Sequence, residues 1–123
     1  MGDRTASARS RGVRGEDTAA GWLAERGYAI LARNFRSRGG EIDIVAEKAG
    51  ALVFVEVKSW RSYGVADLEY AIGAVKQRRI ASAARYFLSR RPALAGRALR
   101  FDVLLLGAGR IEHIENAFSG SVD

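Results

Sequence analysis

The chain has 123 residues, of which 48% are apolar and 28% charged, and it carries a net charge of +6. This balance is typical of one globular domain, and no apolar run approaches the ~20 residues of a membrane span, so we expect no membrane-spanning segment. The absence of cysteine excludes disulfides, cysteine-bound zinc and thiol nucleophiles, and the single histidine, His113, excludes paired-histidine zinc motifs.

The chain begins with a basic segment, residues 1–11, which we interpret as a flexible tail preceding a single domain at residues 12–123. It lacks the apolar centre of a secretory signal, so we expect a cytoplasmic protein. Apolar spacing predicts a helix over residues 12–26, ended by Gly27 in a left-handed conformation. Residues 28–35 then read as a strand.

Two further strands are predicted at residues 41–47 and 52–58. A two-residue turn at Ala49 and Gly50 would join them as a hairpin, with Asp43 opposite Glu56 and Glu41 opposite Lys58. Because opposed side chains lie about 4.5–5.5 Å apart, Asp43, Glu56 and Lys58 would converge on one face. The apolar residues expected on the other face are Ile42, Ile44, Val53, Val55 and Val57.

A long helix is predicted over residues 67–90, stopped by Pro92, and strands follow at 99–106 and 111–116. The apolar positions of the helix are Leu68, Ile72, Val75, Ile80, Ala83 and Phe87. Four aromatic residues at helical spacing are interpreted as core before base-stacking platforms, namely Trp22, Tyr70, Tyr86 and Phe87. Asp102 and His113 are interpreted as structural. The order α-β-β-β-α-β-β predicts an α/β or α+β domain with helices against a mixed sheet.

Positive charge is concentrated in two segments, residues 33–38 and 76–91, and the second has no acidic residue. A polyanion is the expected partner, with nucleic acid the first candidate and an anionic membrane surface the second. The residues predicted to contact phosphates are Arg33, Arg36, Arg38, Lys76, Gln77, Arg78 and Arg79. The alternative for the helical members is an ordinary solvated face.

Two carboxylates on neighbouring strands repel each other more strongly as water is excluded, and a cation between them would relieve the repulsion. Oxygen ligands suit Mg²⁺ or Mn²⁺. The alternative is a solvated sheet face on which Glu56 pairs with Lys58 or Arg38. Of only three lysines in this arginine-rich chain, Lys58 and Lys76 fall in these charged stretches.

The stretch "GEIDIVAEKAGALVFVEVK" resembles the PD-(D/E)xK nuclease pattern. More closely, the chain resembles the YraN family, which is related in fold to archaeal Holliday-junction resolvases. The resemblance runs from "RGEDTAAGWLAERGYAILARNFRSRGGEIDIV" through "LVFVEVKSWRS" and "VKQRRIASAARYFL" to "RFDVLLL" and "IEHIENAF". It implies a restriction-endonuclease-like αβββαβ core.

By position, the resemblance implies that Asp43, Glu56 and the backbone carbonyl of Val57 are ligands of Mg²⁺ or Mn²⁺. Lys58 would orient or activate the attacking water. Glu16 matches an acidic residue that resolvase-like members add to the site, although near a helix N-terminus it could simply stabilise the helix dipole. Glu41 matches the glutamate of the family's "GEID".

The resemblance therefore predicts a metal-dependent DNA endonuclease that acts on branched or nicked DNA, with a homodimer possible because a junction has two strands to cut. The first alternative is a non-catalytic nucleic-acid-binding module with the same fold. The second is a structural protein with protein partners, which predicts neither metal binding nor salt-dependent DNA binding.

Overall fold

The computed structural model describes residues 4–59, 72–107 and 109–120, with side chains of the first helix described from Gly15 onward. The elements are α1 (Arg4–Glu25), β1 (Ala29–Ser37), β2 (Gly40–Lys48), β3 (Ala51–Ser59), α2 (Ala74–Ser89), the short η2 (Pro92–Leu94), β4 (Leu99–Gly107) and β5 (Arg110–Phe118). Their order is the predicted one, and all five strands overlap the segments expected from the sequence.

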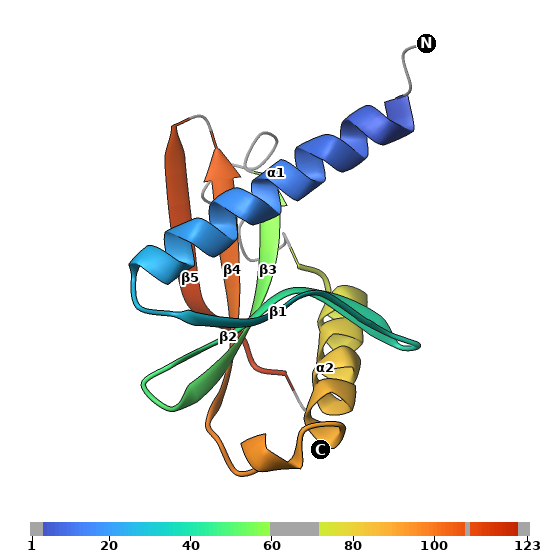
Figure 1. The fold of residues 1–123 in the computed structure, drawn as a ribbon. Helices are drawn as coiled ribbons and strands as arrows, with labels where there is room; N and C mark the ends of the chain where they lie inside the picture. The colour runs from blue at the N-terminus through green and yellow to red at the C-terminus, as the bar shows by residue number, and fades with distance from the viewer. Residues whose placement is uncertain (1–3, 60–71, 108, 121–123) are drawn as a thin grey trace.

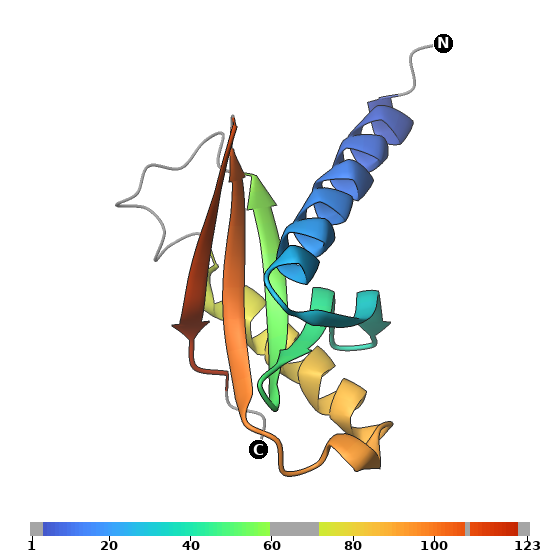
Figure 2. The ribbon, with the colours of Figure 1, turned by 60° about the vertical axis from the view of Figure 1, so that its left-hand side comes forward.

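The five strands form one sheet in the order β1-β2-β3-β4-β5. All neighbours are antiparallel except β3 and β4, which are parallel. Helix α1 crosses one face of the sheet and α2 covers the other, while the β1–β2 hairpin twists out of the sheet toward α2 (Figures 1 and 2). The mixed sheet between helices confirms the predicted fold class.

Each helix buries one apolar side against its face of the sheet. On the α1 side, Leu23 packs in a cluster with Val55 and Leu104. On the α2 side, Phe87 packs with Phe54 and other rings, and the Phe54 and Phe87 rings meet edge to face at 6.1 Å. The two clusters fix both helices, and with them the polar side chains they carry, relative to β2 and β3.

The turn between β2 and β3 sets their register. Ala49 and Gly50 both have positive φ, 52° and 84°. A two-residue hairpin turn requires this conformation to match the twist of its flanking strands. Lys48 therefore faces Ala51, and the pairing continues to Ile44 opposite Val55. The predicted turn is confirmed, and the next residues of the two strands are Asp43 and Glu56.

Both helix starts differ from the prediction. Helix α1 begins at Arg4, so most of the predicted tail is helical, since the segment has no proline and many good helix formers. Helix α2 begins at Ala74, because Gly73 at its N-cap is extended, with φ −72° and ψ 169°. Residues 67–71 of the predicted helix, including Leu68 and Tyr70, lie outside the described residues. Gly27 has φ 91°, which confirms the predicted stop of α1.

Two predicted core residues of α2 are at the surface. Val75, in the first turn of α2, is 59% exposed. Tyr86 is 45% exposed, because its neighbour Phe87 takes the inward position on the last turns. Ile80, Ala83 and Phe87 are buried as predicted. Within the described chain, no helix is long and apolar enough to cross a membrane.

Candidate functional site

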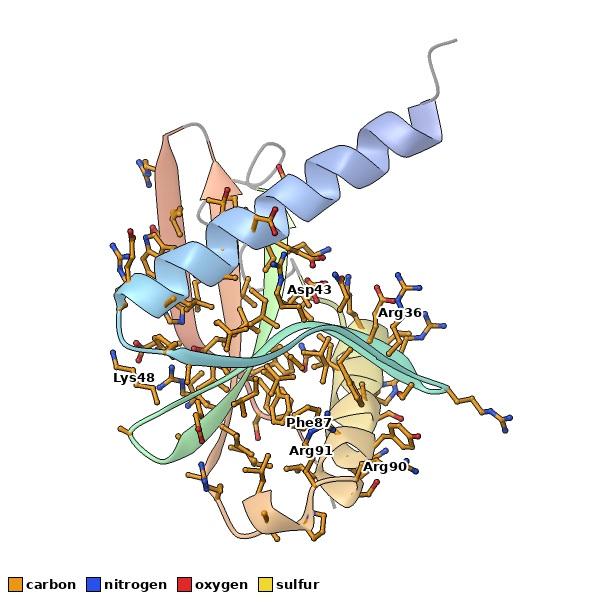
Figure 3. All side chains as sticks on the ribbon, viewed as in Figure 1. Arg36, Asp43, Lys48, Phe87, Arg90 and Arg91 are labelled. Carbon is orange, nitrogen blue, oxygen red and sulfur yellow. The ribbon has the colours of Figure 1, made fainter. Side chains whose placement is uncertain are left out.

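The candidate site forms where β2 separates from β3. The ladder between the two strands runs from Lys48 and Ala51 to Ile44 and Val55. Beyond this ladder, the Val57 N–H donates to the Asp43 carboxylate at 2.8 Å. The side chain of Asp43 thus takes the place of a backbone acceptor and is held beside β3, between α1 and the N-terminal end of α2 in the view of Figure 3.

Glu56 is a nearly buried carboxylate, with 6% of its surface exposed. Burial, followed by repulsion from Asp43, raises the pKa of Glu56 to about 7, although Lys76 lowers it in part. The ammonium of Lys76 lies 2.6 Å from Oε2 of Glu56. The prediction that Asp43 and Glu56 interact is confirmed, and the solvated-face alternative is wrong for Glu56, whose ion-pair partner is neither Lys58 nor Arg38.

Lys58 completes the cluster beside Lys76. Burial and the neighbouring Lys76 charge lower the pKa of Lys58, although Glu56 and Asp43 oppose this effect. For Lys76, burial also disfavours the charge, but the hydrogen bond and charge of Glu56 outweigh it and raise the pKa. The two neighbouring amines are tolerable because the two carboxylates supply the compensating charge.

Glu16 reaches the site from α1. Burial and repulsion from Asp43 raise the pKa of Glu16, while a hydrogen bond from the Asn34 side chain lowers it in part. Its Oε1 is buried and has no hydrogen-bond partner among the described residues. Glu16 is therefore not explained by a helix dipole alone, since it lies in the interior of α1 rather than in the first turn. Asn34, with φ 51°, was not predicted to belong to the site.

Glu41 and Ile42 lie differently from the prediction. Glu41 is exposed and pairs with Arg36 at 3.6 Å, so the predicted position opposite Lys58 is wrong. Ile42 is buried in the cluster under α2, not with Ile44 on the α1 face. Both differences have one cause, since β2 follows the twisting β1 hairpin after Asp43 instead of continuing along β3.

The predicted phosphate-binding residues divide into separate groups. Arg36, Arg38, Lys76 and Arg79 line a cleft of about 800 Å³ between the β1–β2 turn and α2. Arg78 lines a different cleft, with Arg85 and Ser119. Two further members already have partners: Arg33 pairs with Asp17 of α1 at 2.6 Å, and the Gln77 side chain donates to the Ile72 carbonyl at 2.9 Å.

Among the described residues, no three aspartate, glutamate or histidine side chains are gathered as a metal ligand set. A metal at this site would therefore rest on two carboxylates with a backbone oxygen. The donor chemistry fits a hard cation, because Asp43 and Glu56 are mutually repelling carboxylates and Glu16 adds an oxygen without a partner among the described residues. In this structure the ammonium of Lys76 supplies the positive charge that neutralises Glu56. The sequence pattern did not reveal this role of Lys76.

Asp102 and His113 form a separate network, and the structural interpretation of Asp102 is supported. Asp102 is fully buried and accepts hydrogen bonds from Arg100, His113 Nε2 and the Asn116 N–H. These bonds hold the pKa of Asp102 below its usual value despite burial. They tie β4 to β5, and the His113 ring packs edge-on against Trp22 at 5.6 Å.

Comparison with known proteins finds a match to the model of the uncharacterised protein family UPF0102 over residues 15–106. A UPF0102 protein of Geobacter sulfurreducens is 50% identical over 112 residues, which are 87% of each chain. A UPF0102 protein of Persephonella marina is 45% identical over 108 residues, 88% of this chain and 92% of the relative. One from Treponema pallidum is 42% identical over 118 residues, 90% and 94% of the two chains.

Proposed function

Because the chain belongs to the uncharacterised protein family UPF0102, whose name assigns no activity, we propose its function from the site itself: a Mg²⁺- or Mn²⁺-dependent DNA endonuclease. Membership confirms the YraN resemblance noted in the sequence. The observation that carries the proposal is Glu56, a nearly buried carboxylate set against Asp43 and two lysines. An arrangement that costs stability in the resting protein is typical of a functional site.

Asp43 and Glu56, with the carbonyl of Val57, would hold the cation. Once bound, the cation would supply positive charge to the phosphate and acidify the attacking water. The carboxylates would position the cation through their oxygens. The hydrogen bond from the Val57 N–H fixes the Asp43 side chain before any ligand binds. Glu16 extends the acidic surface from α1.

Lys58 would act on the reacting groups. Because its pKa is lowered, a larger fraction of Lys58 is neutral at a given pH than for an ordinary lysine, so its Nζ would orient the attacking water and take or share its proton. The water oxygen would bond to phosphorus as the bond to the 3′ oxygen breaks, leaving a 5′ phosphate and a 3′ hydroxyl. An arginine could not replace Lys58, because the guanidinium stays protonated and is planar.

DNA is the proposed substrate because the cleft beside Lys76 is lined by Arg36, Arg38 and Arg79. Such contacts bind phosphates without reading sequence. By analogy with resolvase-like enzymes, we extend the proposal to branched or nicked DNA as the substrate. The same analogy extends it to a homodimer as the active form.

A non-catalytic nucleic-acid-binding module with the same fold is the second candidate. The Lys76–Glu56 ion pair favours it, because this lysine can neutralise the buried carboxylate without any metal. The basic cleft would be the same in both cases, so DNA binding alone does not separate the two candidates.

A cleavage assay with linear, nicked, flapped and four-way DNAs tests the proposal. Cleavage of at least one DNA with Mg²⁺ or Mn²⁺, lost with chelator and in Asp43→Asn, is the expected result. The Glu25→Gln variant is the matched control, because it removes an exposed carboxylate at the end of α1, outside the cleft. DNA binding without cleavage under every metal condition would favour the binding module.

A further inference from the structure

Tyr86 is an exposed aromatic side chain on the outer side of α2. Tyr86 is 45% exposed, whereas the next residue, Phe87, is fully buried. The ring is supported by Phe35, whose ring centroid lies 6.0 Å away at an interplanar angle of 33°. The Arg90 guanidinium lies 5.9 Å from the Tyr86 ring centroid. A large, supported and accessible ring with a cation beside it is suited to stack on another flat group.

Tyr86 borders a cleft of about 640 Å³ that also includes Arg36, Arg38 and Ser82. This cleft and the larger one that reaches Lys76 share residues 36–39 of the β1–β2 turn. The turn therefore separates two adjoining hollows, one toward the exposed ring and one toward the Lys76–Glu56 pair. Figure 3 shows Arg36 at the turn side of the hairpin and Arg90 near the far end of α2.

The turn is seated directly on α2, so its arginines are carried by a fixed support. A Cβ added to Gly39 would lie 2.1 Å from the Ser82 Oγ, and one added to Gly40 would lie 2.2 Å from the Arg79 carbonyl oxygen. Only glycine permits this approach at Gly40, because its neighbour is backbone that cannot move aside.

We propose that Tyr86 stacks on an unpaired base of a nucleic-acid strand, while Arg36 and Arg38 hold the phosphates between that base and the Glu56 site. A base within a duplex has both faces covered by its neighbours, so a protein ring stacks on a base that has left the helix. Alternating aromatic and cationic groups match the alternating bases and phosphates of a single strand. The arginines argue against a purely apolar occupant, and among the described residues that line the two clefts Glu41 is the only acidic one.

This inference rests on the proposed DNA substrate and narrows it to DNA with unpaired nucleotides beside the cutting position. It concerns binding and needs no metal. Both a flap and the open centre of a branched junction present such nucleotides, whereas an intact linear duplex does not.

The test uses the full chain in chelator, with 2-aminopurine placed in a single-stranded flap or at the centre of a blunt duplex. Wild-type protein should change the fluorescence of the flap probe, which reports stacking. Tyr86→Leu should bind the flapped DNA about tenfold more weakly, the order of one base–aromatic stack, and should bind the duplex within about twofold of wild type. Tyr86→Phe keeps the ring and should behave as wild type.

Two further variants separate stacking from charge. Arg36→Gln with Arg38→Gln should weaken binding of both DNAs and make the salt dependence shallower by about two phosphates. Arg85→Gln is the matched control, since this arginine is on the same helix but lines another cleft. Tyr86→Gln provides a second ring-free variant if the leucine variant melts more than a few degrees below wild type.

Equal affinity of Tyr86→Leu and wild type for flapped DNA would overturn the inference, as would an equal loss on flap and duplex. Binding of a polyglutamate peptide that needs Tyr86, with DNA binding independent of it, would assign the ring to an acidic protein partner and also overturn the inference. If flapped DNA is cleaved while Tyr86→Leu binds it as tightly as wild type, the inference fails and the nuclease proposal stands alone. A Tyr86-dependent flap complex without any cleavage would leave the stacking site standing alone.

Discussion

Replacing Glu56 with glutamine should stabilise the metal-free protein, and the gain should depend on pH. The folded-state pKa of Glu56 is about 7, against 4.5 for the free side chain. Below pH 4.5 the carboxyl is protonated in both the folded and unfolded states, so the variant and wild type should be equally stable. Between these values the unfolded chain ionises first, so the stability of the wild type falls as pH rises.

Above pH 7 the wild type bears the full cost of a buried, repelled carboxylate. The gap between the two pKa values corresponds to about 3 kcal/mol, because each unit is worth about 1.4 kcal/mol. Glutamine has nearly the same shape but no charge, so Glu56→Gln should be more stable by this order at pH 8. For a chain of this length the gain corresponds to about 10 °C in melting temperature.

Urea unfolding of both proteins at pH values from 4 to 8, with chelator, measures the difference. Glu41→Gln controls for the loss of one negative charge, and it should change stability by less than about 0.5 kcal/mol at every pH because exposed ion pairs contribute little. A stability difference that does not grow with pH would refute the reasoning, since the cost of Glu56 would then not come from its ionisation.

Substitutions at three more positions test the division of roles in the site. Asp43→Asn should keep the hydrogen bond from the Val57 N–H through its amide oxygen, so the metal-free variant should be at least as stable as wild type, while DNA cleavage is lost. Thermal melts should show that Mn²⁺ stabilises wild type much more than this variant. Lys58→Ala and Lys58→Arg should both abolish cleavage while Mn²⁺ affinity stays within about threefold, since the lysine is assigned to water and phosphate; a collapse of Mn²⁺ binding would contradict this assignment. Lys76→Gln should raise the Mn²⁺ affinity measured by calorimetry about tenfold, because a cation need no longer displace the ammonium that lies 2.6 Å from the Glu56 carboxylate. Unchanged affinity would mean that the Lys76–Glu56 ion pair and the metal do not compete.

The sequence was sufficient for the parts of the fold that depend on local patterns. Alternating residues and a two-residue turn at Ala49 and Gly50 predicted the β2–β3 hairpin and its register. That register in turn predicted the meeting of Asp43 and Glu56. Gly27 and Pro92 predicted where the helices stop, because their backbone restrictions hold in any context.

The parts that failed depend on contacts between distant segments. The ion pair of Lys76 with Glu56 requires the N-terminal end of α2 to lie at the end of β3, and no local pattern reveals this position. The exposure of Tyr86 depends on which side of α2 meets the sheet. Glu41 was misplaced because the prediction continued a regular pairing past Asp43, where the β1–β2 hairpin instead twists away.

The single parallel step in the sheet has a consequence for the order of folding. The β2–β3 hairpin closes over a two-residue turn, and hairpins form in about 1–10 μs. The pairing of β3 with β4 joins residues as far apart as Ser59 and Leu106, with α2 in the intervening segment, and such long-range pairing is slow because it closes a large loop. The two carboxylates can therefore meet early, in water, where their repulsion is weak. Their repulsion grows only when α2 docks and seals Glu56, so it acts late and should speed unfolding more than it slows folding.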